Sequence, residues 1–157
     1  MPVITLVVYG LLLLVPRLEP QKNSDPAFQT VYGKVIFAVL LLFTGLHVLF
    51  IYKSMGRPAD MTLFVPLLTG LFFSYLGFLI RNAPPNPVFC MNLPGLQEKP
   101  ELQAKANREM GAFFMGLGFL LALGSLLRTP WVVIGMLAVL VFGTPAVIIR
   151  MYIRANG

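Results

Sequence analysis

Four long apolar runs, separated by short polar stretches, constrain this chain more than any other feature. Residues 35–52, 61–80, 111–127 and 131–149 contain no Asp, Glu, Lys or Arg. About 20 apolar residues in a helix cross the hydrocarbon core of a bilayer, and a helix satisfies all its backbone hydrogen bonds without water. Only 11% of the residues are charged, against about 25% in soluble domains. The sequence therefore predicts an all-α integral membrane protein, a polytopic transmembrane helix bundle.

A fifth apolar run precedes these four. It has neither the basic start nor the small-residue cleavage site of a secretory signal, so we expect a short, retained first span. The polar stretch Pro16–Lys34 is predicted to be a loop, because its prolines at 16 and 20 do not fit a helix interior. The chain is expected to form one membrane domain, residues 1–157, with five spans at about 2–16, 35–52, 61–80, 111–127 and 131–149.

The basic residues are distributed unequally between the two sides of the predicted bundle. Nine lie in the first loop, in the polar interval 81–110 and in the tail: Arg17, Lys22, Lys34, Arg81, Lys99, Lys105, Arg108, Arg150 and Arg154. Three lie on the other side: Lys53, Arg57 and Arg128. Because loops rich in Lys and Arg stay in the cytoplasm, the sequence predicts a cytoplasmic interval 81–110, a cytoplasmic C-terminus and an N-terminus outside. The basic residues are scattered rather than clustered, so nucleic-acid binding is not expected.

Small residues predict which spans touch, because helices in lipid approach closely only where side chains are short. The third predicted span offers Gly70, Ser74 and Gly77, and the fourth offers Ala112, Gly116, Gly118, Ala122 and Gly124. We therefore expect these two spans to pack together and to hold the two ends of the interval 81–110. Asp60 is expected to cap the third span. The hairpin at 128–130 is so short that the fourth and fifth spans must be antiparallel neighbours.

His47 is the only ionisable side chain well inside a predicted span, which makes it a candidate functional residue. Two interpretations stay open: a neutral His hydrogen-bonded to a neighbouring helix or to interfacial water, or a ligand or proton role. The chain has one His and one Cys, Cys90, and it has no HExxH, GxSxG or glycine-rich phosphate motif. We therefore expect no enzyme activity, no bound metal and no cofactor.

The interval 81–110 is the expected recognition surface. Its candidate partner- or ligand-binding residues are Asn86, Asn92, Pro94, Asn107 and Arg108. Segment Pro100–Glu109 is predicted to be helical, because proline suits the first helical position and opposite charges recur at four-residue spacing. This helix is either a solvated interfacial lead into the fourth span or a partner-binding face. Arg108 is either an anchor that contacts phosphate headgroups or a residue with a specific ion-pair or substrate role.

Three motifs carry a resemblance to a known family. They are Pro16-Arg17-Leu18-Glu19-Pro20 before two spans, the stretch from Pro85-Asn86 to Pro94 after them, and Asn107-Arg108-Glu109-Met110-Gly111 before the fourth span. This order resembles the SdpI/YhfL family of bacterial membrane proteins. The chain departs from the family pattern where Cys90, Asn92 and Gln103 replace a glycine, an arginine and a tryptophan.

The resemblance implies a non-catalytic immunity or signal-relay protein, multi-pass in a bacterial plasma membrane. Such a protein binds a membrane-active peptide toxin, against which it protects the cell, or a cytoplasmic regulator. The expected partners are therefore the lipid bilayer, a peptide toxin and a cytoplasmic regulator, with an oligomer compatible with either role. The alternative function is a small oligomeric transporter or channel with His47 in its pathway, oligomeric because five spans alone hardly enclose one.

Overall fold

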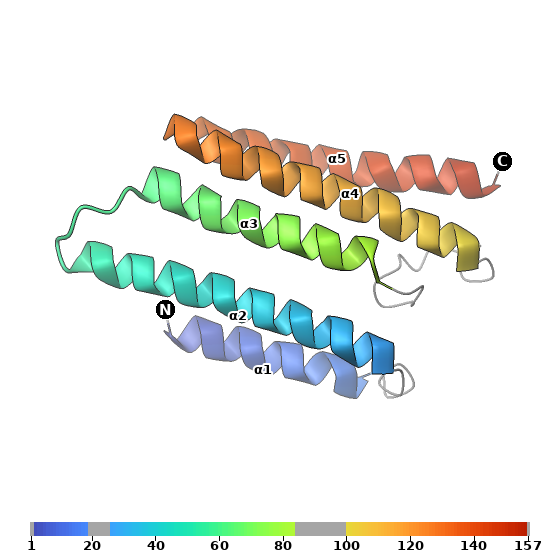
Figure 1. Cartoon of the computed structure of the whole chain (residues 1–157), viewed down its shortest axis with the longest axis horizontal. Coiled ribbons are helices and arrows are strands. Elements are labelled where there is room, and N and C mark those ends of the chain that lie inside the picture. The colour runs from blue at the N-terminus through green and yellow to red at the C-terminus, as the bar shows by residue number, and fades with distance from the viewer. Residues whose placement is uncertain (1, 19–25, 84–99, 157) are drawn as a thin grey trace.

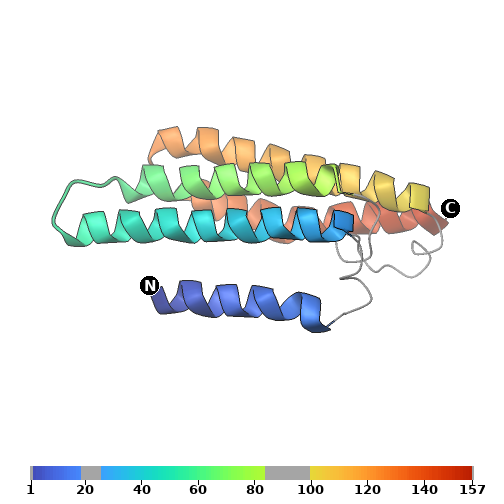
Figure 2. The same cartoon turned by 60° about the horizontal axis from the view of Figure 1, so that its bottom comes forward.

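The computed structural model describes residues 2–18, 26–83 and 100–156, and this part of the chain is helical apart from short connections. Its helices are α1 (Pro2–Leu18), α2 (Pro26–Ser54), α3 (Met61–Arg81), α4 (Pro100–Gly124), the 3-10 turn η1 (Ser125–Leu127) and α5 (Trp131–Asn156). The α-helices lie side by side and alternate in direction, so the two termini mark opposite ends of the bundle (Figure 1). Figure 2 shows α1 at the edge, next to α2.

Four helical segments of the described chain are long and apolar enough to cross a membrane. They are Gln29–Ser54, Met61–Arg81, Gln103–Leu127 and Trp131–Arg150. The prediction of an all-α chain with apolar helices of membrane-spanning length is confirmed for these four. The apolar part of α1, Thr5–Leu14, is shorter. That α1 forms a fifth span, and that the N-terminus lies outside, stays a prediction.

The prediction that Pro16–Lys34 forms a loop is wrong at both ends. α1 continues through Pro16 to Leu18, and α2 begins at Pro26, well before its predicted start at residue 35. Pro26 occupies the first helical position, where an N–H would have no intrahelical acceptor, so its absence costs nothing. The Thr30 hydroxyl then donates to the Pro26 carbonyl at 2.9 Å within this first turn.

Pro16 is tolerated near the end of α1 because the carbonyl that it leaves without a donor finds another. In a regular helix the Leu12 carbonyl accepts from the N–H of residue 16, and proline has none. The Tyr32 hydroxyl of α2 donates to the Leu12 carbonyl at 2.5 Å, and the Tyr32 side chain is buried. One hydrogen bond thus satisfies a backbone group in an apolar environment and fixes α1 against α2.

The core of the bundle is a backbone-to-backbone contact between α3 and α4. A Cβ atom on Gly70 would lie 2.6 Å from the Gly118 carbonyl oxygen, and one on Gly118 would lie 2.5 Å from the Gly70 oxygen. Gly77 and Gly111 repeat this reciprocal contact at 2.6 Å in both directions. Real Cβ atoms essentially never approach within 3.0 Å, so only glycine fits, and Cα–H groups face carbonyl oxygens. The predicted packing of these two helices is confirmed.

Of the five small residues predicted on α4, Gly118 and Ala122 lie in this contact. Gly111, Gly118 and Ser125 are buried, and their seven-residue spacing keeps one side of α4 on α3. Gly116 and Ala112 were predicted to lie in the contact, but Gly116 has open space at its Cβ position and Ala112 is exposed. α4 therefore has two rows of small residues along its length, and the row that contains Gly111 and Gly118 is the one that packs on α3.

α5 packs on α4 through one glycine of each helix, Gly143 of α5 and Gly124 of α4. A Cβ atom on Gly143 would lie 2.8 Å from the ring of Phe113, and one on Gly124 would lie 2.8 Å from Val132. The connection turns sharply because Arg128 adopts the left-handed conformation with φ 50°. The predicted antiparallel neighbourhood of these two helices is confirmed (Figure 1).

Phenylalanine rings extend the contact across the bundle. The centroids of Phe72 and Phe73 lie 5.6 Å apart, those of Phe73 and Phe114 lie 6.0 Å apart with the rings stacked, and those of Phe113 and Phe114 lie 5.7 Å apart. Offset and edge-on ring pairs at such distances are favourable. These rings therefore join α3, α4 and, through Phe113, α5.

Candidate functional site

The predicted site residues fall in separate parts of the molecule. Asn86, Asn92 and Pro94 lie outside the described residues. Asn107 and Arg108 lie in the first third of α4, whereas His47 lies in the half of α2 that leads to Ser54. Figure 1 places these two helix ends at opposite ends of the bundle. The structure therefore does not combine His47 with the other described candidates into one site.

Buried amide side chains distinguish the first turns of α4. Gln103 is 8% exposed and Asn107 only 2%, and their spacing places both on the helix face that continues as Gly111. A buried amide is costly unless it is hydrogen-bonded, and each of these two residues takes part in a polar interaction. Gln103 was not predicted as a site residue. Its four-residue spacing from Asn107 is the signal that would have indicated it.

The opposite face of these turns is charged. Glu101, Lys105 and Arg108 are exposed, so the first turns of α4 have one side against protein and one side toward water or headgroups. This confirms that the segment after Pro100 is helical. The neighbouring last turn of α3 exposes Arg81 and Asn82. We refer to Arg81, Asn82, Gln103, Asn107 and Arg108 together as the polar end.

The polar end is held in place by the glycine contact directly behind it. A Cβ atom on Gly111 would lie 2.6 Å from the Cβ of Arg81 as well as 2.6 Å from the Gly77 oxygen. The last turn of α3 therefore lies directly against the backbone of α4 at Gly111, with no α4 side chain between them. Asn82 closes α3, since its side-chain amide donates to the Phe78 carbonyl at 2.8 Å. These contacts fix the points at which the chain leaves α3 and enters α4.

His47 keeps its two interpretations. The residue is partly exposed, and its Nδ1 atom is buried with no hydrogen-bond partner in the described chain. His47 does not line either of the two cavities between α2 and α3. A role as ligand or proton carrier, and a role as a neutral, hydrogen-bonded side chain, both stay predictions.

A lateral groove, which no sequence pattern predicted, runs between α2 and α3. One cavity, about 430 Å³, is lined by Phe37, Ala38, Leu41, Leu42, Leu68, Leu71, Phe72 and Tyr75. The adjoining cavity, about 550 Å³, is lined by Gly45, Val48, Leu49, Tyr52, Pro58, Ala59, Phe64 and Leu68. Because Leu68 borders both, we refer to the two together as the α2–α3 groove. Its lining is almost wholly apolar.

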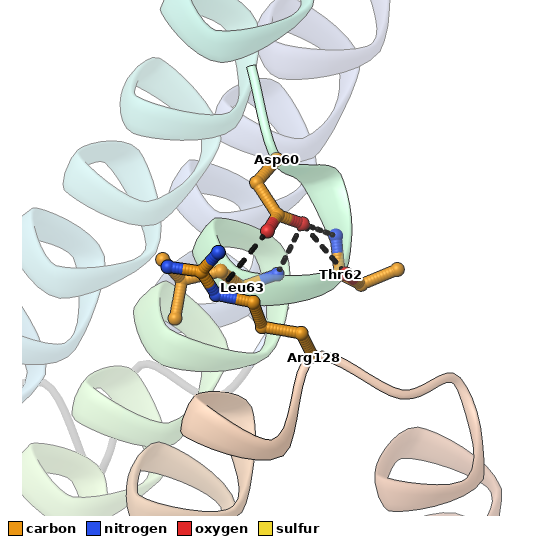
Figure 3. A network of polar contacts seen from close by, with 4 residues as sticks. All are labelled: Asp60, Thr62, Leu63 and Arg128. Carbon is orange, nitrogen blue, oxygen red and sulfur yellow. Dashed lines mark hydrogen bonds and ion pairs between the residues drawn. The ribbon is translucent and has the colours of Figure 1, made fainter. Parts of the chain in front are cut away.

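The end of the bundle opposite the polar end carries an ion pair (Figure 3). The Asp60 carboxylate accepts from the Thr62 hydroxyl at 2.6 Å and from the backbone N–H groups of Thr62 and Leu63 at 3.1 and 3.2 Å. The Arg128 Nε atom lies 3.5 Å from the same carboxylate. The Thr62 hydrogen bond, followed by the backbone donors and Arg128, lowers the pKa of Asp60. The predicted cap is confirmed, and it links the two connections at this end.

Within the described residues, no group of three or more His, Cys, Asp or Glu side chains is placed to hold a metal ion. No protein-family model, curated protein or solved structure matches this chain. The resemblance to the SdpI/YhfL family therefore stays a prediction from its motifs.

Proposed function

We propose that this chain is a non-catalytic membrane receptor of the immunity or signal-relay kind, as the SdpI/YhfL resemblance implies. In this proposal a membrane-active peptide engages the spans, and a cytoplasmic regulator binds the polar end. The single observation that supports the proposal is the glycine contact behind the polar end, where Gly77 and Gly111 bring two backbones together. That contact holds the polar end in one arrangement.

A fixed surface suits recognition because a partner then binds without ordering it first, which lowers the entropic cost of association. The exposed charges Glu101, Lys105 and Arg108 carry both signs on one helix face. Such a pattern favours a partner with the complementary arrangement and disfavours others. The polar end lies at the same end of the bundle as the C-terminus (Figure 1), and we place both in the cytoplasm of a bacterial cell.

The first experiment measures protection. Bacteria that do and do not express the chain are exposed to a panel of membrane-active peptides, and membrane potential is followed with a voltage-sensitive dye. Protection against at least one peptide is expected, and it should fall in the Arg108→Ala variant. Arg150→Ala is the matched control, since it removes another exposed arginine outside the polar end. Equal loss of potential with and without the chain, for every peptide, would contradict the immunity role.

The second experiment tests the polar end directly. A photo-crosslinking amino acid at position 108 should capture one defined cytoplasmic protein in living cells. The same group at position 128, exposed at the opposite end of the bundle, should not capture it. If both positions give the same products, or if position 108 captures only lipid, the signal-relay role is wrong.

The alternative, a small oligomeric transporter or channel, is supported by one observation, the buried Nδ1 atom of His47 that lacks a partner in the described chain. A polar solute needs a polar pathway, whereas the α2–α3 groove is lined by apolar side chains. Liposomes with the purified protein distinguish the two functions. Solute or proton flux that is pH-dependent and lost in His47→Ala supports transport, and no flux at any pH removes it.

A further inference from the structure

The α2–α3 groove extends along much of the length of the bundle. On α2 its lining runs from Phe37 to Tyr52, about 22 Å of helix. The groove exists because α2 and α3 do not approach each other through backbone contacts at glycine, as α3 and α4 do. At Gly45, for example, a Cβ atom would stand at an ordinary 3.4 Å from the side chain of Leu68. The groove is thus a consequence of where the glycines lie.

The volume of the groove decides what fits it. The cavity that adjoins Tyr52 and Pro58 measures about 550 Å³. An apolar cavity of about 150 Å³ holds one benzene ring, or about 25 Å³ per carbon. On that scale 550 Å³ accommodates roughly 20 carbons. This is the size of one fatty acyl chain.

Positive charge surrounds the end of the groove at the α2–α3 connection. The Arg57 guanidinium lies 5.4 Å from the centroid of the Tyr52 ring, and that ring lines the groove. Lys53 and Arg57 are exposed, and neither forms an ion pair within the described chain. The acid at this end, Asp60, is already paired with Arg128 at 3.5 Å. Two exposed cations therefore lie at the connection at the end of an apolar groove, an arrangement that suits a phosphate headgroup with its acyl chain.

We propose that the α2–α3 groove binds one acyl chain of an anionic phospholipid, with the phosphate held by Lys53 and Arg57. The acyl chain enters beside Tyr52 and extends to Leu68. One leaflet of hydrocarbon is about 15 Å deep, so a chain from this side ends near the middle of the groove. The bound lipid fills the space between two helices that do not touch closely.

The test uses the full-length protein in nanodiscs of phosphatidylcholine, with and without phosphatidylglycerol that carries a diazirine on its acyl chain. Illumination of the unsubstituted protein should attach this lipid to the α2 peptides that line the groove and to the α3 peptide that includes Leu68. Native mass spectrometry then counts the lipids retained in detergent. We expect Lys53→Gln/Arg57→Gln to retain phosphatidylglycerol about tenfold less and to lose its preference over phosphatidylcholine. Leu68→Trp, which fills the groove, should lose both lipids.

Two matched variants control for general effects. Arg150→Gln removes an exposed cation elsewhere, and Leu137→Trp adds an indole at a position 54% exposed on α5; both should retain lipid as the original chain does. The proposal is overturned if crosslinks avoid the groove or if the two phospholipids bind equally. It is also overturned if Leu68→Trp converts a dimer to a monomer, which would make a second copy of the chain the occupant.

Discussion

The closeness of α3 and α4 makes Gly77→Ala the sharpest test of this fold. The added Cβ would lie 2.4 Å from the Met115 backbone nitrogen and 2.6 Å from the Gly111 oxygen, whereas ordinary contact begins at 3.4 Å, so the helices must separate by about 1.0 Å. A gap of that size forfeits a quarter to a half of the dispersion energy of each contact across it. Together with two weakened Cα–H···O contacts at about 0.5–1 kcal/mol each, the expected loss is about 1–3 kcal/mol.

Gly116→Ala is the matched control, because it makes the same substitution on α4 where nothing lies within 4 Å. Alanine favours a helix over glycine by about 0.8–1 kcal/mol, and comparison of the two variants cancels this gain. Unfolding is followed by circular dichroism as sodium dodecyl sulfate replaces a mild detergent. The double variant Gly77→Ala/Gly111→Ala should cost less than its single variants predict, because the first alanine already separates the helices. If Gly77→Ala and Gly116→Ala unfold at the same fraction of sodium dodecyl sulfate, the backbone contact between α3 and α4 does not stabilise the bundle.

Three further predictions address other contacts. Tyr32→Phe should weaken the docking of α1 by about 1 kcal/mol, measured by amide exchange of α1, and Pro16→Ala should remove most of that effect because it restores an N–H for the Leu12 carbonyl. The lowered pKa of Asp60 means that its contribution to stability is present above its ordinary value of 3.8 and is lost as pH falls below it. Acid unfolding should therefore be steeper in the original chain than in Asp60→Asn. Gly143→Leu should separate α5 from α4, because even a Cβ would lie 2.8 Å from a phenylalanine ring of α4, and a fluorescence distance between the two helices reports it.

Local chemistry made the boundaries of α3 and α4 predictable. The Asp60 side chain accepts hydrogen bonds from the first backbone N–H groups of α3. Pro100 suits the first position of α4, because a backbone N–H there would have no acceptor within the helix. The same local logic failed at Pro16, where a proline near a polar stretch indicated a loop. A tertiary hydrogen bond from Tyr32 compensates for the missing N–H there. No pattern within the first twenty residues contains that information.

The candidate site was predictable in part for the same reason. Asn107 and Arg108 follow from their place beside a span, and the structure adds that one is buried and the other exposed. Gln103 was not predicted, because its only signal is the helix stripe that it shares with Asn107, four residues further on. Gly116 was wrongly placed in the helix contact, since spacing identifies small residues but not which of two stripes meets α3.

The α2–α3 groove escaped prediction because it depends on the distance between two helices, which no single helix specifies. In lipid, apolar side chains gain little by leaving one apolar environment for another, so helices join where their shapes fit. Gly70 and Gly77 of α3 lie against glycines of α4, so the two backbones meet. Gly45 of α2 lies instead against the side chain of a leucine of α3, which keeps the two backbones apart. The buried share of each helix agrees with this difference in packing: it is 22% for α3 and 33% for α4, but 6% for α2. A bundle built this way has a rigid pair at its centre and a helix beside it that leaves room for an acyl chain.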